Sequence, residues 1–124
     1  MTQTQHTYGA AILAGGGPDR LARKLDVPHK ALIPLNGARI IDYVIDAVEQ
    51  VPHFDRLIAV AHRDGALGHL NTGIEVVETE GDSFIETIET AAEAMAEIDR
   101  MVVCMCDVPM LEPEAVRHFV NSCK

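Results

Sequence analysis

The sequence predicts an α/β fold, a doubly wound, Rossmann-like parallel sheet with helices on both faces. Short, continuously apolar segments alternate along the chain with segments of helical period. Apolar runs of this kind are typical of parallel strands buried on both faces, and helices cover such sheets from either side. With 124 residues, 48% of them hydrophobic, the chain is long enough for one domain or part of one.

Residues 8–77 supply three expected strands and one helix. Tyr8–Ala14 is an apolar run that ends in three glycines, as expected of a buried strand. The segment 40–51 has apolar residues at helical spacing, and Pro52 follows it, which predicts a helix that ends there. The segments 57–61 and 74–77 are two further apolar runs and are expected as strands.

The second half supplies two helices and a fourth strand. A helix is expected to begin at a cap formed by Asp82 or Ser83 and to run through Ile98. The residues of its expected apolar stripe are Ile85, Ile88, Ala92, Met95 and Ala96. The segment 101–106 is expected as a strand that is buried on both faces. A last helix is expected at about 113–122, with a proline in its first turn.

The charge balance excludes two classes of partner. The formal net charge is −9, whereas a nucleic-acid backbone or an anionic membrane surface requires clustered Lys and Arg. No nucleic acid and no membrane are therefore expected as partners. The basic residues are nevertheless concentrated in one segment, which indicates a local anion site. They are Arg20, Arg23, Lys24, Lys30 and Arg39.

Cysteine use and the N-terminal segment indicate a soluble, cytoplasmic protein. The three cysteines, Cys104, Cys106 and Cys123, form no CxxC pattern, which is typical of a reducing compartment. Cys104 and Cys106 share one face of the expected fourth strand, where small packed hydrophobes are expected. Residues 1–7 are polar and are expected as a disordered tail, and no run approaches the ~18 apolar residues of a membrane span.

The glycine-rich loop after the first expected strand is the first candidate binding element. Gly15, Gly16 and Gly17 allow backbone N–H groups to approach a ligand, and successive N–H groups in such a turn form an anion nest. Arg20 adds a guanidinium fork suited to phosphate. The alternative is a flexible glycine turn with Arg20 in solvent. The segment matches neither GxGxxG nor a Walker A loop.

Lys30 and Asp107 are two further candidates. Lys30 could reach back to the same phosphates as a compact point charge, and the alternative is a solvated surface lysine. Asp107 directly follows the fourth expected strand, although Asp-x-Pro is also a common strand-ending turn. Ligands of doubly wound sheets bind outside the carboxyl ends of the strands. We therefore expect Asp107 to lie at the same edge of the sheet as the glycine loop.

Three segments, in this order, resemble the signature of one family. They are LAGGGPDRL at 13–21, PHKALIPLNGARIIDYVIDAV at 28–48 and MVVCMCDVPMLEPEAV at 101–116. They resemble nucleotidyltransferases that join an NTP to a phosphorylated acceptor, and in particular the molybdenum-cofactor guanylyltransferase-like (MobA-like) proteins. The family pattern is Leu-Ala-Gly-Gly-x-Gly-x-Arg, then Pro-Lys-x-Leu and Pro-Leu-x-Gly, then Asp-x-Pro-Leu-Leu. The resemblance runs from about Tyr8 to the end of the chain.

The resemblance implies a fold of the nucleotide-diphospho-sugar transferase type and a role for each matching residue. Catalytic roles fall to Arg20, which would cradle the triphosphate, and to Lys30, which would neutralise phosphate charge in the transition state. Asp107 would bind Mg²⁺. The residues implied to bind the nucleotide are Ala14, Gly15, Gly16, Gly17, Gly81 and Ser83. The implied partners are an NTP and a phosphorylated small-molecule acceptor, and pyrophosphate would be released.

Three departures from the family pattern keep a second interpretation open. Pro18 stands where the pattern has a third glycine and offers no N–H donor, and Asp19 places a negative charge beside the proposed phosphate site. His29 separates Pro28 from Lys30. The alternative to an active transferase is a non-catalytic nucleotide-binding or regulatory module on the same fold, or an inactive fragment.

The expected extent of the domain points the same way. Complete domains of the family continue well past Asp-x-Pro, so residues 8–124 are expected to be the nucleotide-binding half of an incomplete domain. The open edge of its sheet would then be covered by another chain, for example in a homo-oligomer. A dinucleotide-dependent redox domain is disfavoured, because it requires an acid about 20 residues after the glycines, where the chain has 32–36 instead.

Overall fold

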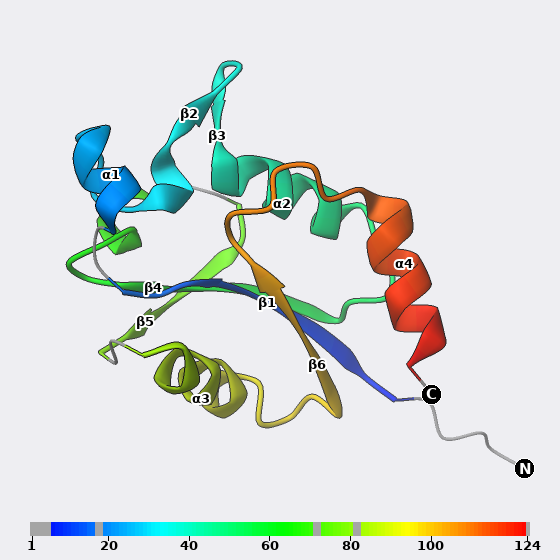
Figure 1. Ribbon diagram of the computed structural model, residues 1–124. Helices are drawn as coiled ribbons and strands as arrows, with labels where there is room; N and C mark the ends of the chain where they lie inside the picture. The colour runs from blue at the N-terminus through cyan, green and yellow to red at the C-terminus, as the bar shows by residue number, and fades with distance from the viewer. Residues whose placement is uncertain (1–5, 17–18, 71–72, 81–82, 124) are drawn as a thin grey trace, which may run out of the picture.

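A parallel sheet of four strands in the order β5-β4-β1-β6 forms the centre of the computed structural model (Figure 1). The structure describes residues 6–16, 19–70, 73–80 and 83–123. β1 (Tyr8–Ala14) pairs with β4 (Arg56–His62) and with β6 (Arg100–Met105), and β4 also pairs with β5 (Glu75–Thr79). Because every pairing is parallel, the carboxyl ends of the four strands lie at one edge of the sheet.

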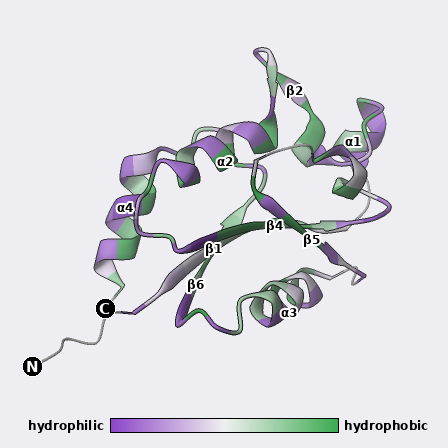
Figure 2. Ribbon diagram, turned by 180° about the vertical axis from the view of Figure 1, so that it is seen from behind, coloured by the Kyte–Doolittle hydropathy of each residue, from purple (hydrophilic) through white to green (hydrophobic). Residues whose placement is uncertain are grey.

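Helices cover both faces of this sheet, which confirms the predicted doubly wound α/β architecture (Figure 1). α2 (Ile40–Glu49) and α4 (Pro113–Ser122) lie on one face, and α3 (Phe84–Ala94) lies on the other. Alternate residues of β1 pack on opposite faces of the sheet. Ile12 lies in the hydrophobic cluster that contains residues of α2, and Leu13 lies in the cluster that contains residues of α3. Figure 2 shows hydrophobic and hydrophilic residues alternating along the helices, as expected for helices with one buried face.

Local interactions explain where the helices begin. Ser83 is the N-cap of α3, and its hydroxyl accepts a hydrogen bond from the backbone N–H of Glu86 at 3.1 Å. The carboxylate of Asp42 accepts one from the backbone N–H of Arg39 at the start of α2. α4 begins with Pro113, as predicted, where a missing N–H costs no helical hydrogen bond.

The predicted length of α3 is wrong, and its predicted buried stripe is correct only in part. The helix ends at Ala94 rather than at Ile98, because the chain turns back there to enter β6. Ile85 is 67% exposed, whereas Thr87 and Ala91 are buried. The buried polar residue is satisfied within the helix, since the Thr87 hydroxyl donates a hydrogen bond to the carbonyl of Ser83 at 3.0 Å. Met95 is buried and Ile88 packs against the same cluster, as predicted, so a stripe drawn from hydrophobic residues alone is correct at these two positions but misses Thr87 and Ala91.

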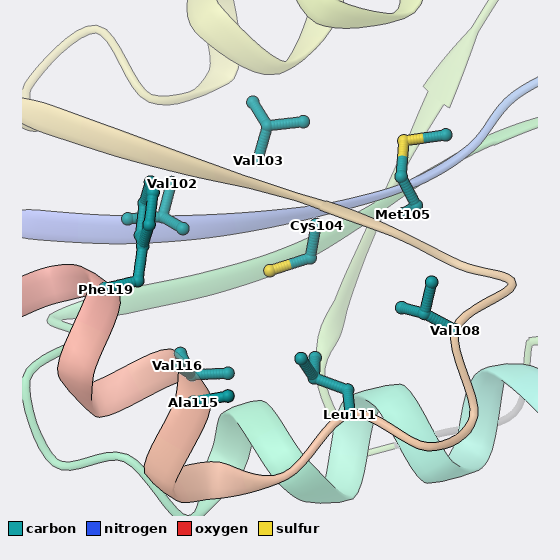
Figure 3. Close-up of a pocket in the computed structure, with 9 residues that line it drawn as sticks. All are labelled: Val102, Val103, Cys104, Met105, Val108, Leu111, Ala115, Val116 and Phe119. Carbon is teal, nitrogen blue, oxygen red and sulfur yellow. The ribbon is translucent and has the colours of Figure 1, made fainter.

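The expectation that the fourth strand is buried on both faces is also wrong. β6 is an edge strand of the described sheet, and Val103 and Met105 are each 37% exposed on the face that α3 covers elsewhere. On the opposite face Cys104 is buried, next to an apolar groove. Figure 3 shows this groove between β6 and α4, with Phe119 at one end and Val108 at the other.

Several short elements were not predicted. They are α1 (Arg20–Lys24), the 3₁₀ turns η1 (Lys30–Leu32) and η2 (Leu67–His69), and the hairpin of β2 (Pro34–Leu35) and β3 (Ala38–Arg39). Asn36 and Gly37 form the hairpin turn with φ of 51° and 90°. Positive φ at both positions is the requirement of a two-residue hairpin turn, and Asn-Gly is its usual sequence.

The N-terminal part of the described chain is joined to the segment that enters β6. Thr7, the last residue of the expected tail, exchanges hydrogen bonds with Asp99: its N–H donates to the Asp99 carboxylate, and its hydroxyl accepts from the Asp99 N–H. Residues 1–5 lie outside the described part of the chain. None of the described helices is long and apolar enough to cross a membrane.

Candidate functional site

The candidate site lies where β1 and β6 end side by side. Gly15 and Gly16 follow β1, and Asp107 follows β6, which pairs directly with β1. The Nζ atom of Lys30 lies 3.0 Å from Oδ2 of Asp107. The structure therefore brings together, at one corner of the sheet, three of the elements that the sequence singles out as candidates.

The ion pair of Lys30 and Asp107 is only partly shielded from solvent. The two side chains are 35% and 36% exposed, so a ligand that enters this corner can contact either of them. The hydrogen bond to Asp107 raises the pKa of Lys30 and keeps its ammonium group charged. This corner thus presents one fixed positive and one carboxylate group, both beside the glycine loop.

His29 connects the Lys30 turn to the glycine loop. Its side chain is buried, with a residue exposure of 3%. Nδ1 accepts a hydrogen bond from the backbone N–H of Ala31 at 3.0 Å, and Nε2 lies 3.0 Å from the carbonyl oxygen of Gly15. His29 is also the N-cap of η1, the 3₁₀ turn that begins at Lys30. The residue that separates Pro28 from Lys30 is therefore part of the architecture of the corner.

The loop after β4 packs tightly against the glycine loop. A Cβ atom added at Gly65 would overlap the carbonyl oxygen of Gly16 and would lie 3.3 Å from Cδ2 of His29. Gly16 has φ of 85°, a conformation that side chains other than glycine rarely adopt. Glycine is thus required at both positions, once for a close approach and once for its backbone conformation.

The N-terminus of α3 approaches the glycine loop from the other face of the sheet. A Cβ atom at Gly15 would meet Cγ2 of Thr87 at 3.0 Å, so only glycine fits above this residue. A pocket opens between the two segments, next to Lys30. Its lining residues are Leu13, Gly15, His29, Lys30, Ser83, Phe84, Thr87, Met105 and Cys106. Ser83, which the resemblance implies to bind the nucleotide, lies in the wall of this pocket.

The other predicted residues are placed less tightly. Arg20 is the first residue of α1, is exposed and forms no ion pair with any described residue. Asp19 caps α1, since its Oδ1 accepts a hydrogen bond from the Ala22 N–H at 2.8 Å. Arg39 does not contribute a free positive charge, because its guanidinium pairs with Asp42. Ala14 is buried at the end of β1, with 1% exposure, so only its backbone can face a ligand.

Four residues of the sequence argument lie outside the described part of the chain. They are Gly17, Pro18, Gly81 and Asp82. The predicted roles of Gly17 and Gly81 therefore stay predictions.

Neither buried cysteine is suited to nucleophilic chemistry. Cys104 and Cys106 pack in the same hydrophobic cluster, which confirms the prediction that they are small packed hydrophobes. Burial raises the pKa of Cys104 to about 11 and that of Cys106 to about 12. Within the described residues there is also no group of three or more His, Cys, Asp or Glu side chains that could hold a metal ion.

The residues that assemble the corner were not among the site residues expected from the sequence. His29 was noted only as a departure from the family pattern, and Gly65 and Thr87 were not noted at all. His29 and Gly65 contact backbone atoms of the glycine loop, and the spacing of residues in the sequence does not predict such contacts. The one available signal was a histidine between a proline and the candidate lysine.

Comparison with known proteins identifies the family. Residues 10–124 match the MobA-like NTP transferase domain, and the chain belongs to this family, as the resemblance in the sequence predicted. It is 28% identical over 117 residues to a molybdenum cofactor guanylyltransferase of Shewanella baltica and 33% identical over 117 residues to that of Yersinia pestis (strain Pestoides F). In each case the match covers 93% of this chain and 56% of the relative, so the chain spans about half the length of these relatives.

Solved structures show the same fold. One is 4-diphosphocytidyl-2C-methyl-D-erythritol synthase, with a TM-score of 0.75 and 17% identity over 96% of this chain and 55% of that one. Another is a CMP:2-keto-3-deoxy-manno-octonic acid synthetase in complex with CTP, with a TM-score of 0.72 and 18% identity over 94% of this chain and 46% of that one. The fold is thus of the nucleotide-diphospho-sugar transferase type, as predicted.

Proposed function

We propose that this chain binds the triphosphate of an NTP, together with Mg²⁺, at the corner formed by the glycine loop, Lys30 and Asp107. The observation that carries the proposal is the 3.0 Å pair of Lys30 and Asp107 beside the loop that follows β1. Family membership supports it, because the relatives are named as guanylyltransferases. The proposed reaction is transfer of a nucleotidyl group to a phosphorylated small-molecule acceptor.

The chemistry of the corner fits this reaction. In the proposed step an oxygen of the acceptor phosphate attacks the α-phosphorus of the NTP, the bond from that phosphorus to the bridging oxygen breaks, and pyrophosphate leaves with the electron pair. Positioning and charge stabilisation are the main requirements of such a step. In the proposed roles the Lys30 ammonium neutralises phosphate charge, Arg20 holds the triphosphate from the start of α1, and the backbone N–H groups of the glycine loop orient it.

The residues of the corner are compatible with Mg²⁺ as the accompanying ion. Mg²⁺ is usually bound by one or two carboxylates, water and the phosphates of the substrate rather than by a complete protein cage. Asp107 offers one partly exposed carboxylate of this kind. Asp107 would hold the ion, and when bound Mg²⁺ would neutralise charge on the phosphates of the nucleotide.

Calorimetric titration tests the binding proposal. We expect binding of at least one of GTP, CTP and ATP in the presence of Mg²⁺. Loss of the Lys30 charge in Lys30→Gln should weaken it by about tenfold to a hundredfold, because hydrogen bonds to charged groups contribute about 1.5 to 3 kcal/mol. Arg117→Gln, at an exposed position of α4, is the matched control and should bind as the wild type does. If no NTP binds below millimolar concentration, or Lys30→Gln binds as tightly as the wild type, the proposal fails.

Turnover is tested separately, since the chain spans about half the length of its curated relatives. Pyrophosphate release is measured with a panel of phosphorylated acceptors and the NTP that binds. Binding with release supports the transferase. Binding without release by this chain and by the longest natural form of the protein supports the alternative, a nucleotide-binding or regulatory module.

A further inference from the structure

We propose that His29 is a positioning residue of the phosphate corner: its imidazole, as the neutral Nε2–H tautomer, fixes the Lys30 turn against the glycine loop. This inference rests on the proposed function, because it concerns the same corner. It gives His29 a role of its own in the affinity for the triphosphate and in how that affinity depends on pH.

The two hydrogen bonds of the imidazole determine its tautomer. The backbone N–H of Ala31 points to Nδ1, so Nδ1 must be an acceptor and carries no proton. In a neutral imidazole the proton is then on Nε2, which donates it to the carbonyl oxygen of Gly15 at 3.0 Å. Both ring nitrogens are satisfied, one by the turn that begins at Lys30 and one by the glycine loop.

The His29 side chain joins two segments that are distant in the sequence, the glycine loop and the turn that begins at Lys30. Gly15 and His29 are 14 positions apart, and the turn that His29 caps is closed by the Leu32 N–H, which donates to the His29 carbonyl at 2.9 Å. The tight approach of Gly65 leaves the ring little room to move on that side. The position of Lys30 relative to the loop is therefore fixed through one buried side chain.

Protonation of His29 would remove the bridge. A proton on Nδ1 would oppose the Ala31 N–H and abolish the hydrogen bond that caps the turn. Burial, the largest effect, lowers the pKa of His29, and the charge of Lys30 acts in the same direction. The Gly15 carbonyl and the carboxylates of Asp19 and Asp107 act against it. The neutral bridge is thus present at neutral pH and is lost in acid.

Two substitutions separate the two hydrogen bonds. In His29→Asn the side-chain oxygen can still accept from Ala31, but the side chain is too short to reach Gly15. In His29→Gln the side-chain nitrogen can still donate to Gly15, but the acceptor for Ala31 is lost. His118→Asn, at an exposed position of α4, is the matched control.

Calorimetry with magnesium GTP, CTP or ATP, whichever binds, measures the consequence for affinity at pH 7.5 and at the lowest pH at which the wild-type chain stays folded. We expect His29→Asn to weaken binding by about tenfold at pH 7.5, the effect of one lost hydrogen bond. His29→Gln should retain more of the affinity. From the higher to the lower pH, the wild type and His118→Asn should lose affinity by a larger factor than either His29 variant. If both His29 variants match the wild type at both pH values, the inference is overturned while the proposed function stands.

Nitrogen-15 NMR of the wild-type chain without nucleotide provides a second test, which is independent of any ligand and of how well the variants fold. We expect a protonated Nε2 and an unprotonated Nδ1 at neutral pH. Where His29→Asn folds, the amides of Gly15 and Gly16 should exchange with solvent faster than in the wild type. A proton on Nδ1, or unchanged exchange in the variant, overturns the inference. Absence of NTP binding by the wild type would instead overturn the proposed function, and the NMR result would still decide the role of His29.

Discussion

Gly65→Ala is expected to destabilise the fold and to disturb the candidate site at the same time. The φ of Gly65 is not positive, so alanine can adopt its backbone conformation, and in open space this change would stabilise the protein by about 0.4 to 1 kcal/mol. Here the new Cβ would overlap the carbonyl oxygen of Gly16, a backbone atom that cannot rotate away. Overpacking of this kind costs about 1 to 3 kcal/mol. We expect a net loss of about 1 to 2 kcal/mol.

Urea unfolding and thermal unfolding measure this loss. A decrease of 1 to 2 kcal/mol corresponds to a lower Tm by about 4 to 8 °C in a chain of this size. Gly68→Ala is the matched control, because a Cβ there meets nothing within 4 Å and its φ is not positive either. The control should be neutral or slightly stabilising. If Gly65→Ala is as stable as Gly68→Ala, the close packing of the two loops is refuted.

Three further predictions concern charge and burial. The pKa of His29 is lowered in the folded chain, so the unfolded chain binds this proton more readily. The contribution of His29 to the free energy of unfolding is therefore complete above pH 6.5 and falls below it by up to about 1.4 kcal/mol per pH unit. In urea titrations, His29→Gln should remove this part of the pH dependence. At pH 8 a thiol reagent should modify only Cys123 in the folded chain, because Cys104 and Cys106 are buried and burial raises the pKa of these two thiols to about 11 and about 12. After denaturation the reagent should modify all three thiols. Rapid labelling of three thiols in the folded state would contradict this prediction. Asp19→Ala removes the cap of α1 and should lower the free energy of unfolding by about 1 kcal/mol. Asp19→Asn can still cap the helix, so it should be as stable as the wild type and should bind NTP at least as tightly as the wild type. Equal stability of the two variants would refute the capping role.

The fold could be predicted because its main signals are local. The run Tyr8–Ala14 and the proline at the start of α4 determine their elements without reference to the rest of the chain. The errors arose where packing between distant segments decides. Thr87 is buried because only glycine lies opposite it at position 15, and Val103 is exposed because β6 is an edge strand. Neither fact can be read from the periodicity of one segment.

The candidate site was predictable to a similar degree. Asp107 was expected at the same edge of the sheet as the glycine loop, since the carboxyl ends of parallel strands lie at one edge, and the pairing of β1 with β6 agrees with this. Lys30 was expected to reach back toward the same site, and its 3.0 Å pair with Asp107 agrees with that expectation. The contacts that fix their surroundings could not be predicted. His29 and Gly65 act on carbonyl oxygens of the glycine loop from positions that are distant in the sequence. Backbone acceptors of this kind carry no sequence signature.

The most direct test of the central claim is an NMR titration of the nitrogen-15-labelled chain with magnesium GTP, and with magnesium CTP and ATP in parallel. If the corner binds the triphosphate, the amide signals of Gly15, Gly16, Lys30 and Asp107 should shift with increasing nucleotide, and Lys30→Gln should reduce these shifts at equal concentration. Shifts confined to the apolar groove around Phe119, or no shifts with any of the three nucleotides, would contradict the claim.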